Sequence, residues 1–532
     1  MKAASMTSMK LKRQVEMKVV KLSGPVAAKS AAWALAIIII AASFIRTECN
    51  PVTLLQGIPG MINLIKDMFP PDFSKWREYL RLTMETVAMG LWGTVIALII
   101  TFPLSFLGAV NTSPNKALQV IVKGIFTFLR AVPELVYALL FVFSLGFGVL
   151  PGILTLSLSA SGLLGKFFVE TIETIDPKPM EAIQATGGHH AAVLRHAVFP
   201  QVLPLFIGYI LYTFDHNVRT AMAIGIIGAG GLGLELFRTM ETFKYPQVLA
   251  ILIIMFLIVT AVDRLSLYVR NKIISGDLLE KGRRIIFRIV LILIIISCTA
   301  LLVYIPLDLN QAVKGLPFLF SFISKTFPPD FSEMPKYMNL IIDTLAIGIS
   351  GTVIAVIISI PLGILASKNF VRFPVVFNIA REIINFFRAI GDVVFALIFV
   401  VAVGLGPFAG VLALGVHSAG LLAKFYSEAV ENIDTKPKEA LEATGAKTIQ
   451  VIRHSVFPQI MPLFNSYNLY ILDRNIRTST VLGLVGAGGI GFELTMGIRL
   501  FQYNKILALL IIILTTIFIV DKISEYIRKK IV

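Results

Sequence analysis

The sequence contains little cysteine, histidine or charge. Its 532 residues include two cysteines and six histidines, and 15% are Asp, Glu, Lys or Arg. Cys49 and Cys298 have neither CxxC spacing nor a nearby ligand cluster, so no disulfide framework or metal site is indicated. No G-x-x-x-x-G-K-[ST] run occurs, which excludes a P-loop ATPase within this chain, and no nucleophile–base pair recurs. We therefore expect a chain that is not an enzyme and that binds no cofactor or metal itself.

Apolar residues, by contrast, are abundant and lie in long runs. The chain is 56% hydrophobic, with a mean hydropathy of +0.82. Runs of this length and composition are typical of membrane-spanning helices and are unusual in soluble proteins. The clearest runs are residues 31–45, 87–102, 135–156, 249–262 and 289–305. They predict an all-α polytopic membrane protein in contact with the lipid bilayer.

The formal net charge of +16 has two explanations. A basic chain can bind nucleic acid, but no basic helix interleaved with aromatic residues suggests a base-stacking surface here. The basic residues instead gather in 1–21, 264–288 and the last eleven residues, as in the cytoplasmic flanks of membrane helices. We therefore expect no nucleic-acid partner, and we expect both termini to lie in the cytoplasm.

The chain is an internal duplication with a constant offset. The sequence FPPDF begins at Phe69 and Phe327, and GTVIA begins at Gly93 and Gly351, so both repeats are 258 residues apart. Six spans per half are expected near 26–45, 84–109, 119–145, 148–170, 199–217 and 244–268, with the second set displaced by 258. Because six is even, both halves insert in the same orientation, related by a pseudo-two-fold axis along the membrane normal. The predicted fold is thus a tandem duplication of a six-span domain, with about twelve transmembrane helices.

A polar segment follows the fourth predicted span of each half. The segments 181–204 and 439–462, here called the coupling elbows, share a Glu-Ala pair, a glycine six residues after the Glu, and closing prolines. The Glu-Ala half favours a short helix, the glycine permits a turn with positive φ, and the prolines mark the start of a new helix. Each elbow is predicted to be a cytoplasmic docking surface for a partner protein. Its candidate coupling residues are Glu181, Ala182 and Gly187, and in the second copy Glu439, Ala440 and Gly445.

Polar residues also occur inside predicted spans, where charge is costly and usually faces a cavity or a partner. The candidate residues of a substrate pathway are Arg130, Asp215, Asn217 and Arg219, with Arg388, Asp473, Asn475 and Arg477 in the second half. Arg130 and Glu134 are four residues apart, which places them on one helical face. One interpretation is structural: an intrahelical ion pair, or an arginine that snorkels to the cytoplasmic end of the span. The other is a role in the substrate pathway or its gate. Arg219 similarly either pairs with Asp215 or offers forked donors to an oxyanion.

Glycine-rich runs close the fifth span in each half. Residues 228–233 and 486–491 both fit G-x-G-x-x-G formally, the pattern of dinucleotide-binding loops. That assignment requires a preceding strand, whereas these runs lie in an apolar membrane segment. We interpret them as sites of close helix approach or of a broken helix.

The coupling elbows resemble the Glu-Ala-Ala loop of ABC-importer permeases. Together with Arg130–Leu139 and 217–233 in the first half, and with Arg388–Leu397 and 475–491 in the second, they make each half similar to the phosphonate-type permeases of binding-protein-dependent ABC importers. The two elbows depart from that pattern at Ile183 and Leu441, where an Ala is usual. The fusion is a further departure, because such permeases are commonly separate chains.

The resemblance divides the chain into three parts. Residues 1–25 form a cytoplasmic basic tail, 26–274 a first permease domain with its core at 84–268, and 275–532 a second with its core at 342–526.

The resemblance implies a bacterial inner-membrane protein with two copies of a cytoplasmic ATPase, which bind the ATP, and an extracytoplasmic substrate-binding protein. The implied substrate is phosphonate, phosphite or phosphate, moved by alternating access. The alternatives are an importer for methionine or a thiamine derivative, and an ion-driven secondary transporter.

A paired charge reversal tests the elbows. We expect Glu181→Lys combined with Glu439→Lys to leave membrane insertion intact and to abolish ATP-dependent uptake, because both docking handles change sign. Membrane fractionation and an uptake assay in vesicles measure the two effects. Normal ATP-dependent uptake by the double variant would remove the coupling assignment.

Overall fold

A computed structural model of the chain describes residues 26–274, 309–369, 371 and 373–531. Within these residues the regular elements are helices, and no strand occurs. The first half contains α2 (Val26–Arg46), α3 (Pro51–Met68), α4 (Trp76–Gly108), α5 (Lys116–Ala131), α6 (Glu134–Leu145), α7 (Val149–Glu173), α8 (Lys178–Ala185), α9 (His190–Val193), the π-helical turn η1 (Leu194–Val198), α10 (Phe199–Ile224), η2 (Gly225–Ala229), α11 (Gly231–Glu241) and α12 (Tyr245–Ile274).

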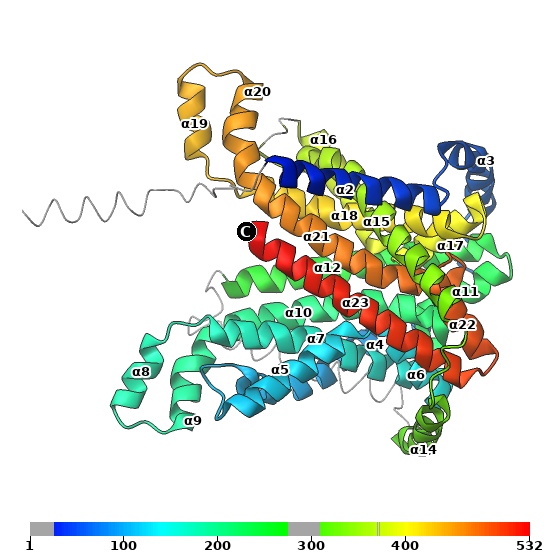
Figure 1. The fold of residues 1–532 in the computed structure, drawn as a ribbon, viewed down its shortest axis with the longest axis horizontal. Coiled ribbons are helices and arrows are strands. Elements are labelled where there is room, and N and C mark those ends of the chain that lie inside the picture. The colour runs from blue at the N-terminus through cyan, green and yellow to red at the C-terminus, as the bar shows by residue number, and fades with distance from the viewer. Residues whose placement is uncertain (1–25, 275–308, 370, 372, 532) are drawn as a thin grey trace, which may run out of the picture.

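The second half repeats this order (Figure 1). It contains α14 (Leu309–Thr326), α15 (Met334–Leu365), α16 (Pro374–Ala389), α17 (Asp392–Val403), α18 (Pro407–Glu431), α19 (Lys436–Ala443), α20 (Thr448–Val451), η3 (Ile452–Val456), α21 (Phe457–Leu482), η4 (Gly483–Val485), α22 (Ile490–Arg499) and α23 (Tyr503–Ile531).

Most of the predicted spans are present among the described residues. Seven helices are long and apolar enough to cross a membrane, and ten spans result if each of three bent helix pairs counts as one. The predicted fifth span of the second half, α21, is not among them. Its Asn465, Asn468 and Arg474 stand at the positions of Ile207, Ile210 and His216 of α10, which makes this helix less apolar. The span expected near 284–303 lies outside the described residues, as does the basic tail 1–25.

The predicted third span of each half is two helices rather than one. α5 and α6 meet at 83°, and α16 and α17 meet at 91°. In the first half the break is at Val132 and Pro133, because a proline forces the preceding residue into an extended conformation. In the second half Gly391 adopts φ −64° and ψ 150°, the backbone geometry of the proline it replaces. Both halves therefore keep the same break with different residues.

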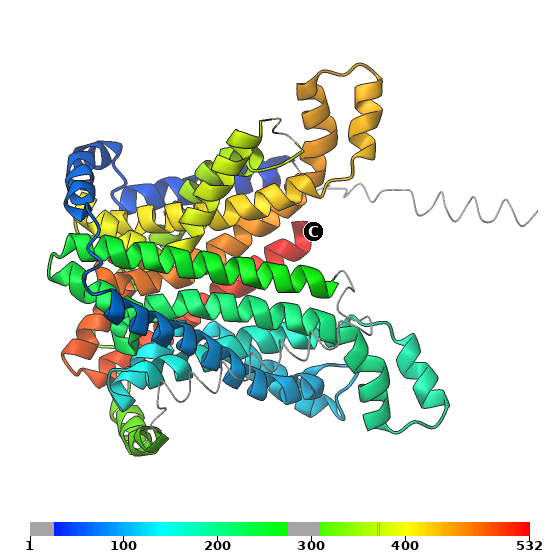
Figure 2. The ribbon, with the colours of Figure 1, turned by 180° about the vertical axis from the view of Figure 1, so that it is seen from behind.

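The first helices of each half also pack against helices of the other half. α2 packs on α15, α3 packs on α17, and α14 packs on α6. Arg46 of α2 donates from Nε to Oδ1 of Asp343 at 2.5 Å, and the hydroxyl of Thr47 reaches Ser350. Figure 2 shows the same arrangement from behind, with the helices of the two halves side by side along the bundle.

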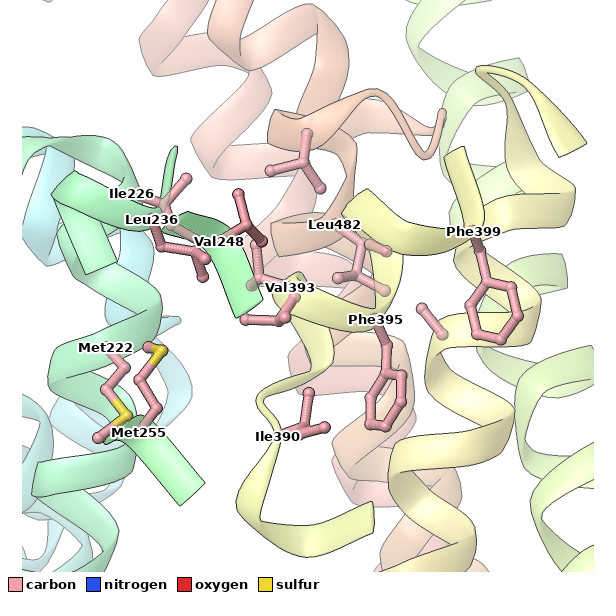
Figure 3. Close-up of a cluster of buried hydrophobic side chains, with 14 of the residues drawn as sticks. Met222, Ile226, Leu236, Val248, Met255, Ile390, Val393, Phe395, Phe399 and Leu482 are labelled. Atoms are coloured by element: carbon pink, nitrogen blue, oxygen red, sulfur yellow. The ribbon is translucent and has the colours of Figure 1, made fainter. Parts of the chain in front are cut away.

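The halves share one apolar core (Figure 3). Met222, Leu236 and Val248 of the first half belong to the same buried cluster as Val393 and Leu482 of the second. Burial of this shared apolar surface stabilises the association of the two halves within one chain.

The repeated FPPDF sequence forms a structural turn at the start of α4 and α15. The backbone N–H of Asp72 donates to the carbonyl of Pro246 at 3.0 Å, and that of Asp330 donates to Asn504 at 3.1 Å. The backbone N–H of Ser74 also donates to the Asp72 carboxylate, which holds the pKa of Asp72 below its usual value. These bonds tie the turn to the first residues of the last helix in each half.

The glycine-rich runs form a tight reversal at the end of α10 and α21, following a helix rather than a strand. Gly228 has a φ of +108° and Gly486 a φ of +89°. A Cβ on Gly233 would lie 2.0 Å from the carbonyl oxygen of Met222, and one on Gly491 would lie 1.8 Å from that of Thr480. The interpretation as close helix approach is confirmed, since no larger residue fits between these backbones.

A pair of glycine variants tests this packing. We expect Gly491→Ala to destabilise the protein by about 1–3 kcal/mol, because the added methyl group meets backbone. The matched control is Gly124→Ala in α5, where nothing lies within 4 Å and alanine favours the helix. Thermal unfolding in detergent, followed by tryptophan fluorescence, compares the two. Equal midpoints for both variants would contradict the close approach.

Candidate functional site

The two coupling elbows project from the same end of the helix bundle. α8 with α9 forms one elbow and α19 with α20 forms the other, and both extend beyond the bundle in Figures 1 and 2. Glu181, Ala182, Glu439 and Ala440 are exposed on α8 and α19. The arrangement leaves both elbows accessible from one side.

The glycine of each elbow makes the predicted turn. Gly187 and Gly445 both have a φ of +79°, a conformation that side chains with a Cβ rarely adopt. The following prolines behave differently from expectation, because α10 directly continues α9 and the π-helical turn η1. Pro200 lies in the first turn of α10, and the wider π turn accommodates it. The second helix of each elbow, α9 or α20, thus continues into α10 or α21, the helix that carries Arg219 or Arg477.

A side-chain brace fixes the base of each elbow. Gln201 accepts from the N–H of Asp176 at 3.1 Å and donates to its carbonyl at 3.4 Å. Gln459 and Asp434 repeat both bonds at 3.0 and 3.3 Å. In the sequence these residues are marked by their recurrence at the offset of 258, and they are not among the predicted site residues. The brace joins the end of α7 or α18 to the start of α10 or α21.

Arg130 does not pair with Glu134, although the two stand four residues apart. The break between α5 and α6 separates them, so the predicted shared helical face does not exist. Arg130 instead donates from Nη2 to Oδ2 of Asp521 in the other half at 3.1 Å. Arg388 likewise lies 3.6 Å from Asp263 in the first half. The two arginines therefore form reciprocal ion pairs across the halves.

The carboxylates of the broken span bind residues of the fifth span in their own half. Glu134 lies 3.2 Å from Nε2 of His216 and accepts from the Ser159 hydroxyl at 3.2 Å. Asp392 lies 3.5 Å from Nη2 of Arg474. The structure thus connects the short helices α6 and α17 to the helices that carry the elbows.

The two arginines of the fifth span each form an ion pair within one helix. Arg219 contacts Asp215, and Arg477 contacts Asp473, one helical turn away. The structural pair that the sequence left open is therefore present in both halves. One carboxylate oxygen of each aspartate, Oδ1, is buried without a partner among the described residues.

The two asparagines tie this helix to the second span. Asn217 donates to the Thr94 hydroxyl at 2.9 Å, and Asn475 donates to Thr352 at 3.0 Å. Their exposed fractions are 1% and 0%. Both amides are occupied inside their own half.

Arginines of both halves gather near the boundary between them. Arg219 lies within Coulombic range of Arg388 and Arg474 and of the carboxylate of Asp263. Guanidinium groups at membrane depth are costly unless they are paired or bind an anion. Each of these arginines lies beside a carboxylate, that of Asp215, Asp263 or Asp392, which offsets this cost.

A double-mutant cycle tests the reciprocal pairs. We expect Arg130→Ala and Asp521→Ala to be coupled by about 1 kcal/mol in the free energy of unfolding, because they remove one shared ion pair. Arg130→Ala and Glu134→Ala serve as the control and should be additive, since the helix break separates them. Unfolding in sodium dodecyl sulfate measures both cycles. Coupling to Glu134 but not to Asp521 would restore the intrahelical pair.

Comparison with known proteins gives relatives over almost the whole chain. The chain is 36% identical over 484 residues to the phosphate-import permease protein PhnE of Mycolicibacterium smegmatis, covering 91% of each. It is 43% identical over 223 residues to the phosphite transport system permease protein PtxC of Stutzerimonas stutzeri, covering 42% of this chain and 81% of that protein. A probable D-methionine transport system permease protein, MetI of Haemophilus influenzae, is 29% identical over 36% of this chain and 94% of its own length.

Among solved structures, a chain of the inward-facing MetNI methionine ABC transporter matches 38% of this chain and 99% of its own, at 22% identity and a TM-score of 0.34. The model of the binding-protein-dependent transport system inner membrane component matches twice, at residues 93–275 and 359–532. The two matches correspond to the two halves of the duplication and together cover more than half of the chain. The chain is thus a tandem duplication in which one polypeptide carries two permease domains, and it is a multi-pass transport subunit, not an enzyme. It belongs to the family of binding-protein-dependent transport system inner membrane components, and this membership implies an ATPase and a substrate-binding protein as partners.

Proposed function

We propose that this chain is the complete transmembrane pathway of an ATP-driven importer for phosphonate or a related phosphorus oxyanion, phosphite or phosphate. The observation that carries the proposal is the relative named as a phosphate-import permease, which aligns with 91% of the chain. The relatives named for D-methionine transport align with only 36%. The arginine cluster at the boundary of the halves supports an anionic substrate, because guanidinium groups bind phosphate-like oxygens with paired donors.

Two copies of the ATPase dock on the two coupling elbows. Two elbows of equal geometry offer two equal binding sites, which supports a stoichiometry of two. Each elbow continues into the helix that carries Arg219 or Arg477, so a displacement of the elbow is transmitted along α10 or α21. ATP binding draws the two ATPase subunits together and tilts the two halves, which exposes the pathway alternately to the two sides of the membrane.

The orientation follows from the elbows and the charge bias. α2 begins and α23 ends at the elbow end of the bundle (Figure 1). The basic residues of the two termini belong in the cytoplasm, where an ATPase finds ATP. The protein therefore lies in the bacterial inner membrane with both termini inside, and the substrate-binding protein delivers the anion at the opposite face.

The substrate pathway runs between the halves past the arginines. Arg130 and Arg388, with Arg219 and Arg477, supply the positive groups that the anion passes. Asp215 and Asp473 form ion pairs with the arginines of the fifth span. Asn217 and Asn475 bind that span to the second span of the same half.

Reconstitution tests the function. The full chain, placed in liposomes with its ATPase and binding protein, is expected to take up methylphosphonate, phosphite or phosphate with ATP and not without it. Methionine and thiamine are the comparison solutes, and a protonophore separates ATP-driven from ion-driven transport. Uptake of methionine alone, or uptake that needs no ATPase, would contradict the proposal.

In the same assay, Arg219→Ala combined with Arg477→Ala should lower anion uptake while the ATPase still co-purifies, because the elbows are unchanged. Wild-type uptake kinetics would leave these arginines with a structural role only.

A further inference from the structure

The broken span has diverged between the halves at three contacting positions. Glu134, Ser159 and His216 of the first half correspond to Asp392, His417 and Arg474 of the second, each 258 residues later. The three positions lie on the short helix after the break, on α7 or α18, and on the helix that carries the elbow. The second half therefore has an extra permanent positive charge at this place.

His417 holds Arg474 in a defined position. Its Nδ1 lies 2.8 Å from the carbonyl oxygen of Ile390, which can only accept, so Nδ1 carries the ring proton. Its Nε2 lies 3.1 Å from Nη2 of Arg474, which can only donate, so Nε2 is the acceptor. The histidine is thus neutral and orients the guanidinium.

The remaining contacts of Arg474 are long. Asp392 and the Ser418 hydroxyl both lie 3.5 Å away, at the limit of a hydrogen bond. The guanidinium has five N–H donors, so several are not used in close contacts. In the first half, by contrast, Glu134 is in contact with both His216 and Ser159 at 3.2 Å.

Arg388 lies beside the break between α16 and α17. It lies in the last turn of α16, and both Arg388 and Arg474 lie within Coulombic range of Arg219 and of the Tyr212 hydroxyl. Arg388 is only 9% exposed, and its Nε is buried without a partner among the described residues. Its carboxylate neighbour, Asp263, lies 3.6 Å away, whereas the equivalent pair in the other half, Arg130 with Asp521, is hydrogen-bonded at 3.1 Å.

We propose that Arg388 and Arg474 form an asymmetric oxyanion-binding site on the second half of the chain. This inference rests on the proposed function and names the groups that recognise the substrate. The unused donors of the two guanidinium groups bind oxygens of one tetrahedral phosphorus oxyanion at the break between α16 and α17. The first half, with a histidine at the position of Arg474, forms no equal site, so the anion binds off the pseudo-two-fold axis.

Exchange of residues between the halves tests the site. The reconstituted importer with loaded binding protein is supplied with methylphosphonate, phosphite or phosphate, and anions moved per ATP hydrolysed are measured. We expect Arg474→His, which copies the first half, to lower this ratio about tenfold, because a charge-assisted contact is lost. The matched control, His216→Arg, should not lower it.

Arg474→Lys keeps the charge but lacks the forked donors, and we expect it to lower the ratio as well. Binding-protein-stimulated ATP hydrolysis should persist in both variants of Arg474, which shows that they are folded and coupled. A wild-type ratio in Arg474→His and Arg474→Lys would overturn the site and leave the proposed function standing. An equal loss in His216→Arg would overturn the asymmetry. If the unaltered importer moved none of the three anions, the proposed function itself would fail.

Discussion

The reciprocal ion pairs Arg130–Asp521 and Arg388–Asp263 are the contacts on which this arrangement depends. An arginine at membrane depth must meet a carboxylate or an anion, and here each half supplies the carboxylate that the other half needs. The two domains therefore satisfy each other's polar groups. A fused chain keeps these complementary partners together, and the apolar cluster that includes Met222 and Val393 surrounds the same boundary.

Duplication also explains how the halves could diverge without losing the fold. Gly391 keeps the backbone conformation of Pro133, so the break survives the loss of proline. At the neighbouring positions, by contrast, the exchange of His216 for Arg474 accompanies the exchange of Ser159 for His417. In the second half, His417 accepts a hydrogen bond from Arg474. Backbone geometry has been retained while side-chain charge has changed, and this is the pattern of a shared scaffold with one specialised side.

The coupling elbows connect this polar boundary to the outside of the bundle. A brace such as Gln201 with Asp176 fixes the elbow on the fourth span, and the unbroken helix through η1 joins it to the fifth. Displacement of an elbow therefore moves the helix that carries Arg219 rather than bending a loose loop. The same brace and the same order of helices occur in the second half, at Gln459 and along α20, η3 and α21.

The sequence by itself determined the helical membrane class, the offset of 258 and the turn at the glycine of each elbow, because hydropathy, repetition and glycine geometry are local or periodic. At the glycine-rich runs the sequence left close helix approach and a broken helix open, and the structure shows the close approach at Gly233. Only the tertiary structure decided the partners of the charged residues. Arg130 and Glu134 have the spacing of a helical pair, yet a two-residue break turns them apart, toward Asp521 and His216. Spacing along the chain predicts contact only while the helix continues, and at membrane depth a charge takes the partner that folding places beside it, here in the other half of the molecule.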